Sequence, residues 1–160
     1  MAEEPYPLAD FLPYLLNRAA EETSLGFQAL YRERYGMLRT EWRVLFHLGG
    51  HGDLSARDVC ERAGLHKTVV SRAVAALEAK RMLTRTVSEA DRRREVLTLT
   101  RRGRAAYRDL SAEARRYDEA LAGRLDAEEE RVLRRCLKRL AGLQRPGAPG
   151  ATGEADAVIA

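Results

Sequence analysis

The stretch SARDVCERAGLHKTVVSRAVAALEAK, residues 55–80, decides the fold. Ser55 and Asp58 have the spacing of a capping box, in which two side chains satisfy free backbone N–H groups at a helix start. The helix that they begin is predicted to be short and to end at Gly64, because glycine readily adopts the conformation that closes a helix. Apolar residues then recur at helical spacing over 67–80. Two short helices joined by a glycine-containing turn are typical of a helix-turn-helix.

The second of these helices, called the reader helix below, has an outer face suited to reading DNA. Four apolar residues are predicted to face the core: Val70, Ala73, Val74 and Leu77. The residues left on the outer face are His66, Lys67, Thr68, Ser71, Arg72 and Ala75. In a helix-turn-helix, the N-terminal residues of the second helix reach base edges in the major groove. Arg72 can bond to guanine through two N–H groups, and Thr68 and Ser71 can bond to bases or phosphates.

A β-hairpin is predicted directly after the reader helix. Residues 83–87 and 95–99 have the composition and alternation of short strands. The polar tip between them contains Asp91, Arg92, Arg93 and Arg94. Arginines at such a tip suit a narrow minor groove, where the negative potential is enhanced. The pattern predicts a mainly α fold, with a winged helix-turn-helix over about 38–100 and the small β-hairpin as its wing.

Basic residues are concentrated in this part of the chain. The 160 residues have a formal net charge of +4, yet residues 66–104 contain 11 Lys or Arg and 4 Asp or Glu. This segment therefore carries +7, and the other residues together carry −3. A basic island in an otherwise slightly acidic chain indicates a localised contact with a polyanion, although a solvated charged surface would give the same count.

Further helices are predicted on both sides of this lobe, at about 10–35 and 101–143. Together with the lobe they are expected to form a single domain over 10–143. Residues 1–9 are expected to form a flexible arm. Residues 144–160, which are rich in Gly, Pro and Ala, are expected to form a disordered tail.

The sequence also predicts where these helices begin and end. Asp10 is expected to cap the first helix and Gly36 to end it. Thr40 is expected to cap the next helix, which the glycines of 49–52 are expected to stop. Thr100 is expected to cap the long helix that follows the hairpin.

Two apolar stripes in the C-terminal helices have the three- and four-residue spacing of a helix–helix seam. The first consists of Tyr107, Leu110, Ala114, Tyr117 and Leu121. The second consists of Leu133, Cys136, Leu140 and Leu143. A chain with one small lobe has few places to bury both, so we expect a homodimer interface. A two-fold axis predicts a pseudo-palindromic double-stranded DNA operator with half-sites about 10 bp apart.

Taken together, these motifs resemble the MarR family of bacterial transcriptional regulators over roughly residues 8–143. The resemblance rests on GLHKTVVSR at 64–72, DRR at 91–93 and LTLTRRG at 97–103. It implies a winged-helix dimer in which the first and the last two helices interlock between subunits. Each subunit would place one reader helix in the major groove.

The resemblance also implies roles for single residues. It assigns DNA contacts to Thr68, Val69 and Arg72, and a minor-groove contact to Arg93. It implies that Asp91 orients an arginine of the wing. It further implies a cavity for a small effector, often aromatic or phenolic.

Four aromatic residues stand where such an effector pocket would lie between the first helix and the DNA-reading lobe: Phe27, Tyr31, Trp42 and Phe46. Aromatic residues at helical spacing are also common in plain hydrophobic cores, so both interpretations stay open.

No metal site and no cofactor are expected. His47 and His51 are four residues apart, as in a metal pair on a helix, but the glycines that follow His47 are expected to break that helix. Cys60 and Cys136 have no metal or redox spacing and are expected to be core residues. A metal- or thiol-responsive regulator stays a minor alternative.

The sequence thus predicts a sequence-specific transcriptional regulator, a dimeric repressor that a small-molecule effector releases from its operator. The alternative is an architectural DNA-binding protein of low specificity, which would use the same basic face. No nucleophile–base set or phosphate loop indicates an enzyme. No apolar run approaches the ~20 residues of a membrane span, and the N-terminus lacks the basic region of a signal peptide. We therefore expect a cytoplasmic protein without a membrane partner.

Overall fold

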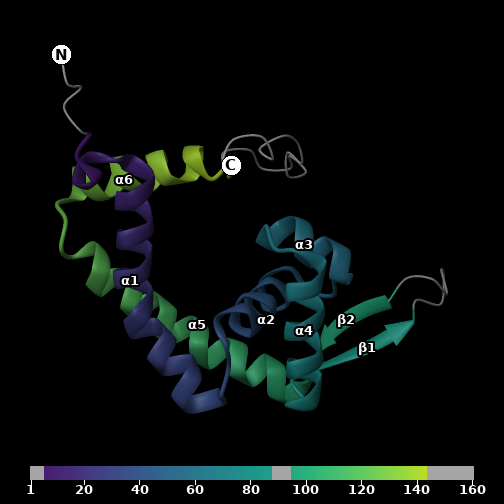
Figure 1. The fold of residues 1–160 in the computed structure, drawn as a ribbon. Helices are drawn as coiled ribbons and strands as arrows, with labels where there is room; N and C mark the ends of the chain where they lie inside the picture. The colour runs from purple at the N-terminus through teal and green to yellow at the C-terminus, as the bar shows by residue number, and fades with distance from the viewer. Residues whose placement is uncertain (1–5, 88–94, 144–160) are drawn as a thin grey trace.

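The computed structural model describes residues 6–87 and 95–143; residues 1–5, 88–94 and 144–160 lie outside the described residues. As predicted, the described chain is mainly α-helical with one small antiparallel sheet (Figure 1). Its elements are the 3₁₀ turn η1 (Leu8–Asp10), α1 (Leu12–Tyr35), α2 (Arg39–His51), α3 (Ala56–Ala63), α4 (Lys67–Ala79), β1 (Leu83–Val87), β2 (Glu95–Leu99), α5 (Arg101–Ala122) and α6 (Ala127–Leu140). None of these helices combines the length and the apolar character that a bilayer crossing requires.

The elements are arranged as a lobe and a helical extension. Figure 1 shows α2, α3, α4 and the hairpin gathered into one lobe. The long helices α1 and α5 lead away from this lobe to α6, which lies near the start of α1. The predicted reader helix is α4, and it is held between α2, α3 and the hairpin.

Two of the expected helix caps are wrong. The N-cap of α1 is Phe11 rather than Asp10, which ends the preceding turn, and the N-cap of α2 is Leu38 rather than Thr40. Neither N-cap side chain accepts a hydrogen bond. Both residues are exposed, so water can satisfy the free N–H groups of these helix starts. The expected end of α1 is confirmed, because Gly36 closes the helix at φ 59°.

The expected end of α2 within 49–52 is confirmed at Gly52, but Gly49 and Gly50 do not break the helix as expected. The helix continues through Gly49 and Gly50 to His51, and Gly52 ends it. A Cβ atom on Gly49 would overlap the ring of Tyr107. Glycine weakens a helix interior, but here its missing side chain lets Tyr107 of α5 lie directly against α2.

The local signals around the helix-turn-helix are confirmed. The Ser55 hydroxyl accepts a bond from the N–H of Asp58, and the Asp58 carboxylate accepts one from the N–H of Ser55. Gly64 closes α3 at φ 58°. The two strands occupy the predicted residues, and Leu54 adds a short bridge to Leu97 at the sheet edge.

The hydrophobic core lies where α2, α4, α5 and the sheet meet. The predicted inner face of the reader helix is confirmed, because its four apolar residues are at most 2% exposed: Val70, Ala73, Val74 and Leu77. The largest of the other fully buried side chains are Met37, Leu45, Met82, Leu83, Leu97 and Leu110. The core therefore fixes α4 from behind and leaves its outer face open.

The two stripes predicted for a dimer seam differ in the structure. The α5 stripe packs inside the protomer, which corrects the prediction: Leu110 is fully buried, and Tyr107, Ala114 and Tyr117 pack against the core. The reason is that α1 and α2 cover this side of α5.

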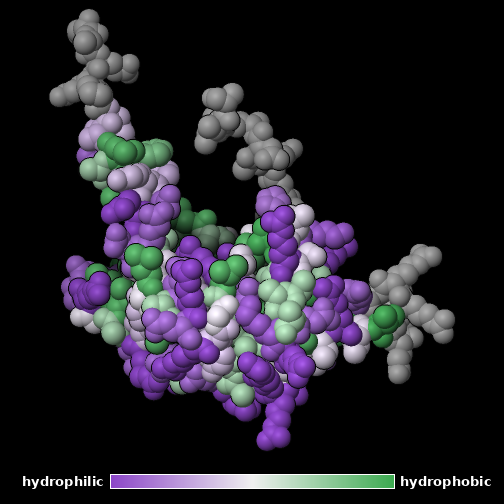
Figure 2. Space-filling model, turned by 60° about the horizontal axis from the view of Figure 1, so that its bottom comes forward, coloured by the Kyte–Doolittle hydropathy of each residue, from purple (hydrophilic) through white to green (hydrophobic). Residues whose placement is uncertain are grey.

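The three leucines of the predicted C-terminal stripe are uncovered, as are the first described turns of the chain. Leu133, Leu140 and Leu143 are 45–67% exposed, Cys136 of the stripe is half-buried, and Leu137 beside it is 40% exposed. Near them in the fold, the first turns of the chain expose Leu8, Phe11, Leu12 and Leu15. Figure 2 shows hydrophobic residues gathered beside the N-terminal trace, above a mostly hydrophilic surface. These eight large apolar residues, Cys136 excluded, are called the apolar end below.

Candidate nucleic-acid interface and adjoining cavity

The reader helix presents the predicted contact residues to solvent. Val69 is half-buried, and the remaining members of the predicted set are exposed: His66, Lys67, Thr68, Ser71 and Arg72. Within residues 6–87 and 95–143, no hydrogen bond or ion pair engages the side chains of Lys67, Thr68, Ser71 or Arg72. One helix face therefore carries side-chain donors that the described part of the protomer does not use.

The first turn of α4 adds positive potential to this face. It contains no acidic residue, and the side chain of the N-cap residue His66 makes no capping bond. The free N–H groups and the dipole of a helix start favour anions such as phosphate. The side chain of Lys67 stands at the same end of the helix.

The other end of α4 is closed by a residue in an unusual conformation. Arg81 has φ 57°, a left-handed value that residues other than glycine rarely adopt. The Met82 N–H donates to the carbonyl of Leu77 at 2.9 Å, which closes the last turn. The Thr100 hydroxyl donates to the carbonyl of Arg81 at 2.8 Å, so the start of α5 holds this turn in place.

This junction gives a physical reason for the motif at 97–103. As predicted, Thr100 caps α5, and its hydroxyl accepts a bond from the Gly103 N–H at 3.1 Å. A Cβ atom on Gly103 would overlap the carbonyl oxygen of Met82. Glycine is thus required for α5 to approach the end of the reader helix, and the sequence alone showed it only as part of a motif.

The base of the wing is tied to the reader helix. Arg85 of β1 donates to the Glu78 carboxylate of α4 at 3.1 Å and pairs with Glu95 of β2 at 3.6 Å. The predicted tip residues lie outside the described residues: Asp91, Arg92, Arg93 and Arg94.

A cavity of about 370 Å³ lies between α1, α2 and α5. Three of the four predicted aromatic residues line it, namely Phe27, Tyr31 and Trp42. Phe46 does not line the cavity, which corrects the prediction. Its ring is held deeper, between those of Trp42 and Tyr107, at centroid distances of 5.0 and 5.3 Å.

The cavity combines an aromatic wall with polar groups. The rings of Tyr31 and Trp42 are stacked, with their centroids 5.6 Å apart. Burial raises the pKa of the Tyr31 hydroxyl, although the positive charge of Arg39 acts to lower it. The indole N–H of Trp42 is buried without a hydrogen-bond partner among the described residues. Arg39 lies at the cavity wall. Arg39 was not predicted from the sequence as a cavity residue, although its spacing of three residues from Trp42 puts both on one helix face.

Comparisons with known proteins identify the family. The model of the MarR family matches residues 35–94, from the end of α1 to the hairpin. A MarR family transcriptional regulator from Silicibacter pomeroyi DSS-3 is 30% identical, with a TM-score of 0.71, over 85% of this chain and 99% of that one. The chain belongs to the MarR family of transcriptional regulators.

Two other proteins support this assignment. Bordetella bronchiseptica BpsR, whose DNA binding is regulated by 6-hydroxynicotinic acid, is 25% identical with a TM-score of 0.78, over 86% of this chain and 98% of that one. The uncharacterised HTH-type transcriptional regulator YwaE of Bacillus subtilis (strain 168) is 23% identical over 126 residues, 79% of this chain and 74% of that protein. The predicted winged helix-turn-helix fold and DNA-binding class are therefore confirmed.

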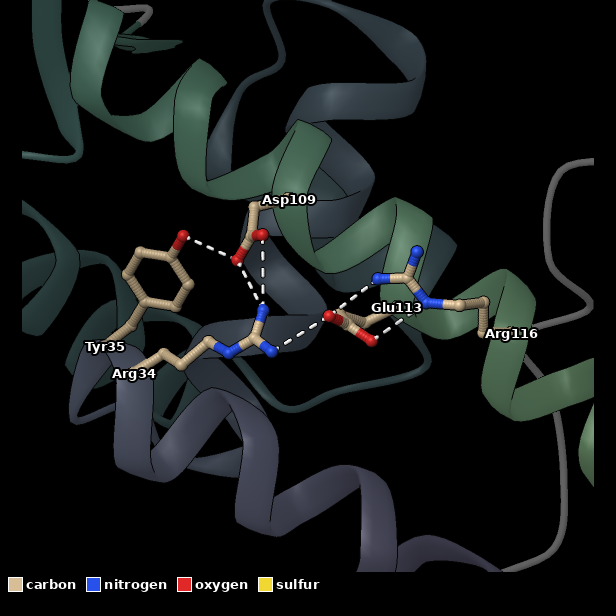
Figure 3. A network of polar contacts seen from close by, with 5 residues as sticks. All are labelled: Arg34, Tyr35, Asp109, Glu113 and Arg116. Carbon is tan, nitrogen blue, oxygen red and sulfur yellow. Dashed lines mark hydrogen bonds and ion pairs between the residues drawn. The ribbon is translucent and has the colours of Figure 1, made fainter.

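In this MarR family chain, a polar network fixes α1 against α5 near the cavity (Figure 3). Arg34 donates to Asp109 at 3.2 Å and to Glu113 at 2.9 Å. The Tyr35 hydroxyl donates to Asp109 at 2.8 Å. Arg116 and Arg34 hold the pKa of the Glu113 carboxyl below its usual value. Exposed pairs contribute little singly, so the network's role is to set the relative position of the two helices.

His47 and His51 lie on one continuous helix, although the sequence predicted a helix break between them. Because α2 is continuous, the rings of His47 and His51 are stacked at 5.9 Å. Burial lowers the pKa of His47, and the charges of His51, Arg43 and Arg62 lower it further. Such cationic surroundings disfavour a metal ion, and the part of the chain that the structure describes contains no group of three or more potential ligands.

The two cysteines differ in their surroundings. Cys60 is half-buried and packs against the core, as expected. Cys136 is also half-buried but lies on α6, outside the core, which corrects the prediction for this residue. Both thiols are free.

Proposed function

We propose that the protein is a homodimeric repressor that binds a pseudo-palindromic operator and leaves it when a small aromatic effector fills the cavity. The unpaired polar face of α4 carries this proposal. Its exposed side chains Lys67, Thr68, Ser71 and Arg72 have no partner in the described chain. Arg72 reads a guanine edge, and the hydroxyls and Lys67 position the helix on the backbone.

The wing extends the proposed contact to the minor groove. Arg85 fixes the base of the hairpin against α4, and the following roles are proposed for the tip residues. Arg93 enters the minor groove, Arg92 and Arg94 contact phosphates, and Asp91 orients an arginine. Narrow minor grooves favour arginine through their negative potential.

The apolar end supports the proposed dimer. Eight large apolar side chains from the first turns, from α6 and from Leu143 after it are 40–67% exposed in the protomer. A second copy of the chain would cover them through a two-fold interface. The two reader helices would then meet two half-sites about 10 bp apart.

The cavity supports the proposed effector. Its aromatic wall suits a planar ring, and the guanidinium of Arg39 suits an acidic substituent. The DNA binding of BpsR, which has this fold, is regulated by an aromatic acid. Trp42 is the only tryptophan, so its fluorescence reports directly on the cavity.

In vitro selection from random duplex DNA tests the proposal. We expect the protein to enrich an inverted repeat, and 6-hydroxynicotinic acid or another planar aromatic acid to quench Trp42 and release the enriched duplex. Enrichment of no sequence, with equal binding to all duplexes, would contradict the repressor and favour the architectural protein. Enrichment without release by any acid that quenches Trp42 would contradict the effector mechanism alone.

A further inference from the structure

Glu41 is an unusual residue in this core. It is 3% exposed and is the one charged residue that is buried among the described residues. Its Oε2 atom accepts a hydrogen bond from Nζ of Lys80 at 2.8 Å. Glu41 belongs to α2, and Lys80 is the C-cap of the reader helix α4. The pair therefore joins the first helix of the lobe to the end of the helix that meets DNA.

The pair is partly buried, since the Lys80 side chain is 28% exposed. Such an ion pair adds little to stability, because the cost of taking charge out of water offsets the attraction. It does impose a geometry, since the two charged atoms must stay within bonding distance. Apolar contacts between α2 and α4 tolerate small sliding movements better than a directional bond does. The Glu41–Lys80 pair is thus better suited to fixing a position than to holding the lobe together.

The position of Glu41 along α2 adds a second observation. Its neighbour Trp42 and the preceding Arg39 line the cavity, while Glu41 does not line it and is bonded to Lys80 at the end of α4. One rigid helix of 13 residues therefore carries both the cavity wall and the attachment of the reader helix. A shift of α2 at the cavity would move the point to which Lys80 is bound.

We infer that Glu41 and Lys80 are positioning residues that hold the reader helix in its DNA-reading orientation, and that α2 transmits changes at the cavity through them. This inference rests on the proposed function. Neither residue needs to touch DNA. The end of α4 is also held by Thr100 and Gly103, so loss of the pair changes the orientation of the helix without releasing it.

The first test is the double variant Glu41→Leu/Lys80→Met, which replaces the pair by apolar groups of similar size. We expect an unfolding temperature close to that of the wild type, unchanged affinity for random duplex, and at least a tenfold loss of affinity for the duplex selected by the wild type. A purely structural pair would instead change the unfolding temperature and leave the ratio of the two affinities intact. Wild-type operator affinity in the double variant would overturn the inference.

Lys80→Arg keeps the charge and the ion pair, so it provides a second test if the double variant is poorly folded. Its longer, forked group alters the α2–α4 distance, and we expect a several-fold loss of operator affinity alone. Unchanged operator affinity would overturn the inference. The matched control, Glu128→Leu/Arg131→Met, removes an exposed ion pair of α6 and should leave both affinities unchanged. If the wild type itself selects no sequence, the proposed function fails rather than this inference.

Discussion

The reader helix α4 and the last helix α6 both leave one face uncovered in the protomer. The face of α4 lacks hydrogen-bond partners, whereas the face of α6 lacks apolar packing partners. On α4, Lys67, Thr68, Ser71 and Arg72 are exposed hydrogen-bonding groups with no partner in the described chain. On α6, the uncovered residues are leucines, such as Leu140 at 60% exposure. Unused donors indicate a polar, anionic partner, whereas uncovered leucines indicate a second apolar surface. The kind of partner can thus be inferred from what each face leaves unsatisfied.

The largest effect is expected from breaking the α6 face. Leu137→Glu/Leu140→Glu places charges in the proposed interface and should give a monomer, because buried unpaired carboxylates are costly. Two linked reader helices gain about 10²–10⁴-fold in affinity over one, so operator binding should fall by that factor. Light scattering after gel filtration measures the mass, and a gel-shift titration measures the affinity. A variant that stays dimeric would refute this interface.

The next largest effect is expected at the junction that fixes the end of α4 against α5. The proposed interface on α6 does not depend on this junction. Gly103→Ala places a methyl group against the carbonyl of Met82. Overpacking of this kind costs about 1–3 kcal/mol, and here backbone must move, so we expect the upper end of that range. Chemical unfolding measures the loss. Gly50→Ala is the control, because a Cβ atom there would make only an ordinary van der Waals contact with Tyr107. An equal loss of unfolding free energy in both variants would contradict the close approach of α5.

Arg72→Ala changes the polar face without touching the apolar one. It should cost about 1–3 kcal/mol in operator binding and relax the preference at one base position. The dimer should be unaffected, since Arg72 has no intramolecular partner in the described residues. Parallel titrations with single-base variants of the operator measure this preference. A uniform loss on all sequences would make Arg72 a phosphate contact instead.

The smallest effect concerns pH. The pKa of His47 is lowered in the folded protein by burial and by neighbouring cations. As pH falls below the usual value of about 6.5, the unfolded chain takes up a proton that the folded chain resists, so stability falls until the lowered pKa is reached. His47→Gln should flatten the decline in unfolding free energy between about pH 7.5 and 5.5. The control His66→Gln, at an exposed site, should retain the wild-type decline. If the unfolding free energy falls with pH equally in His47→Gln and in the wild type, the account is contradicted.

Local signals allowed much of the lobe to be predicted from the sequence. The helix boundaries expected from local signals are confirmed at Ser55 with Asp58, at Gly64 and at Thr100. Each of these signals acts through bonds to residues a few positions away. The strands followed from alternation. Asp10 and Thr40 failed as caps because a capping residue type does not ensure a capping position when the helix start is exposed to water.

Features that depend on distant residues were not predictable. Gly49 was predicted to stop the helix, because the sequence does not show that the ring of Tyr107 packs against it in the fold. Glu41 and Lys80 are 39 positions apart, and no local pattern pairs them. The α5 stripe has the spacing of a seam, but whether it faces α1 or a second subunit depends on the fold. Arg39 is different, because its spacing of three residues from Trp42 was a local signal that could have placed it at the cavity.

The most direct test of the central claim is the ratio of affinities for the selected operator and for a random duplex of equal length, measured at about 150 mM salt. If α4 reads bases through its unpaired side chains, the wild type should prefer the operator by at least ~10³-fold. Arg72→Ala should lower that ratio about tenfold or more. A wild-type ratio near one would contradict the account, because phosphate contacts alone would then explain all DNA binding.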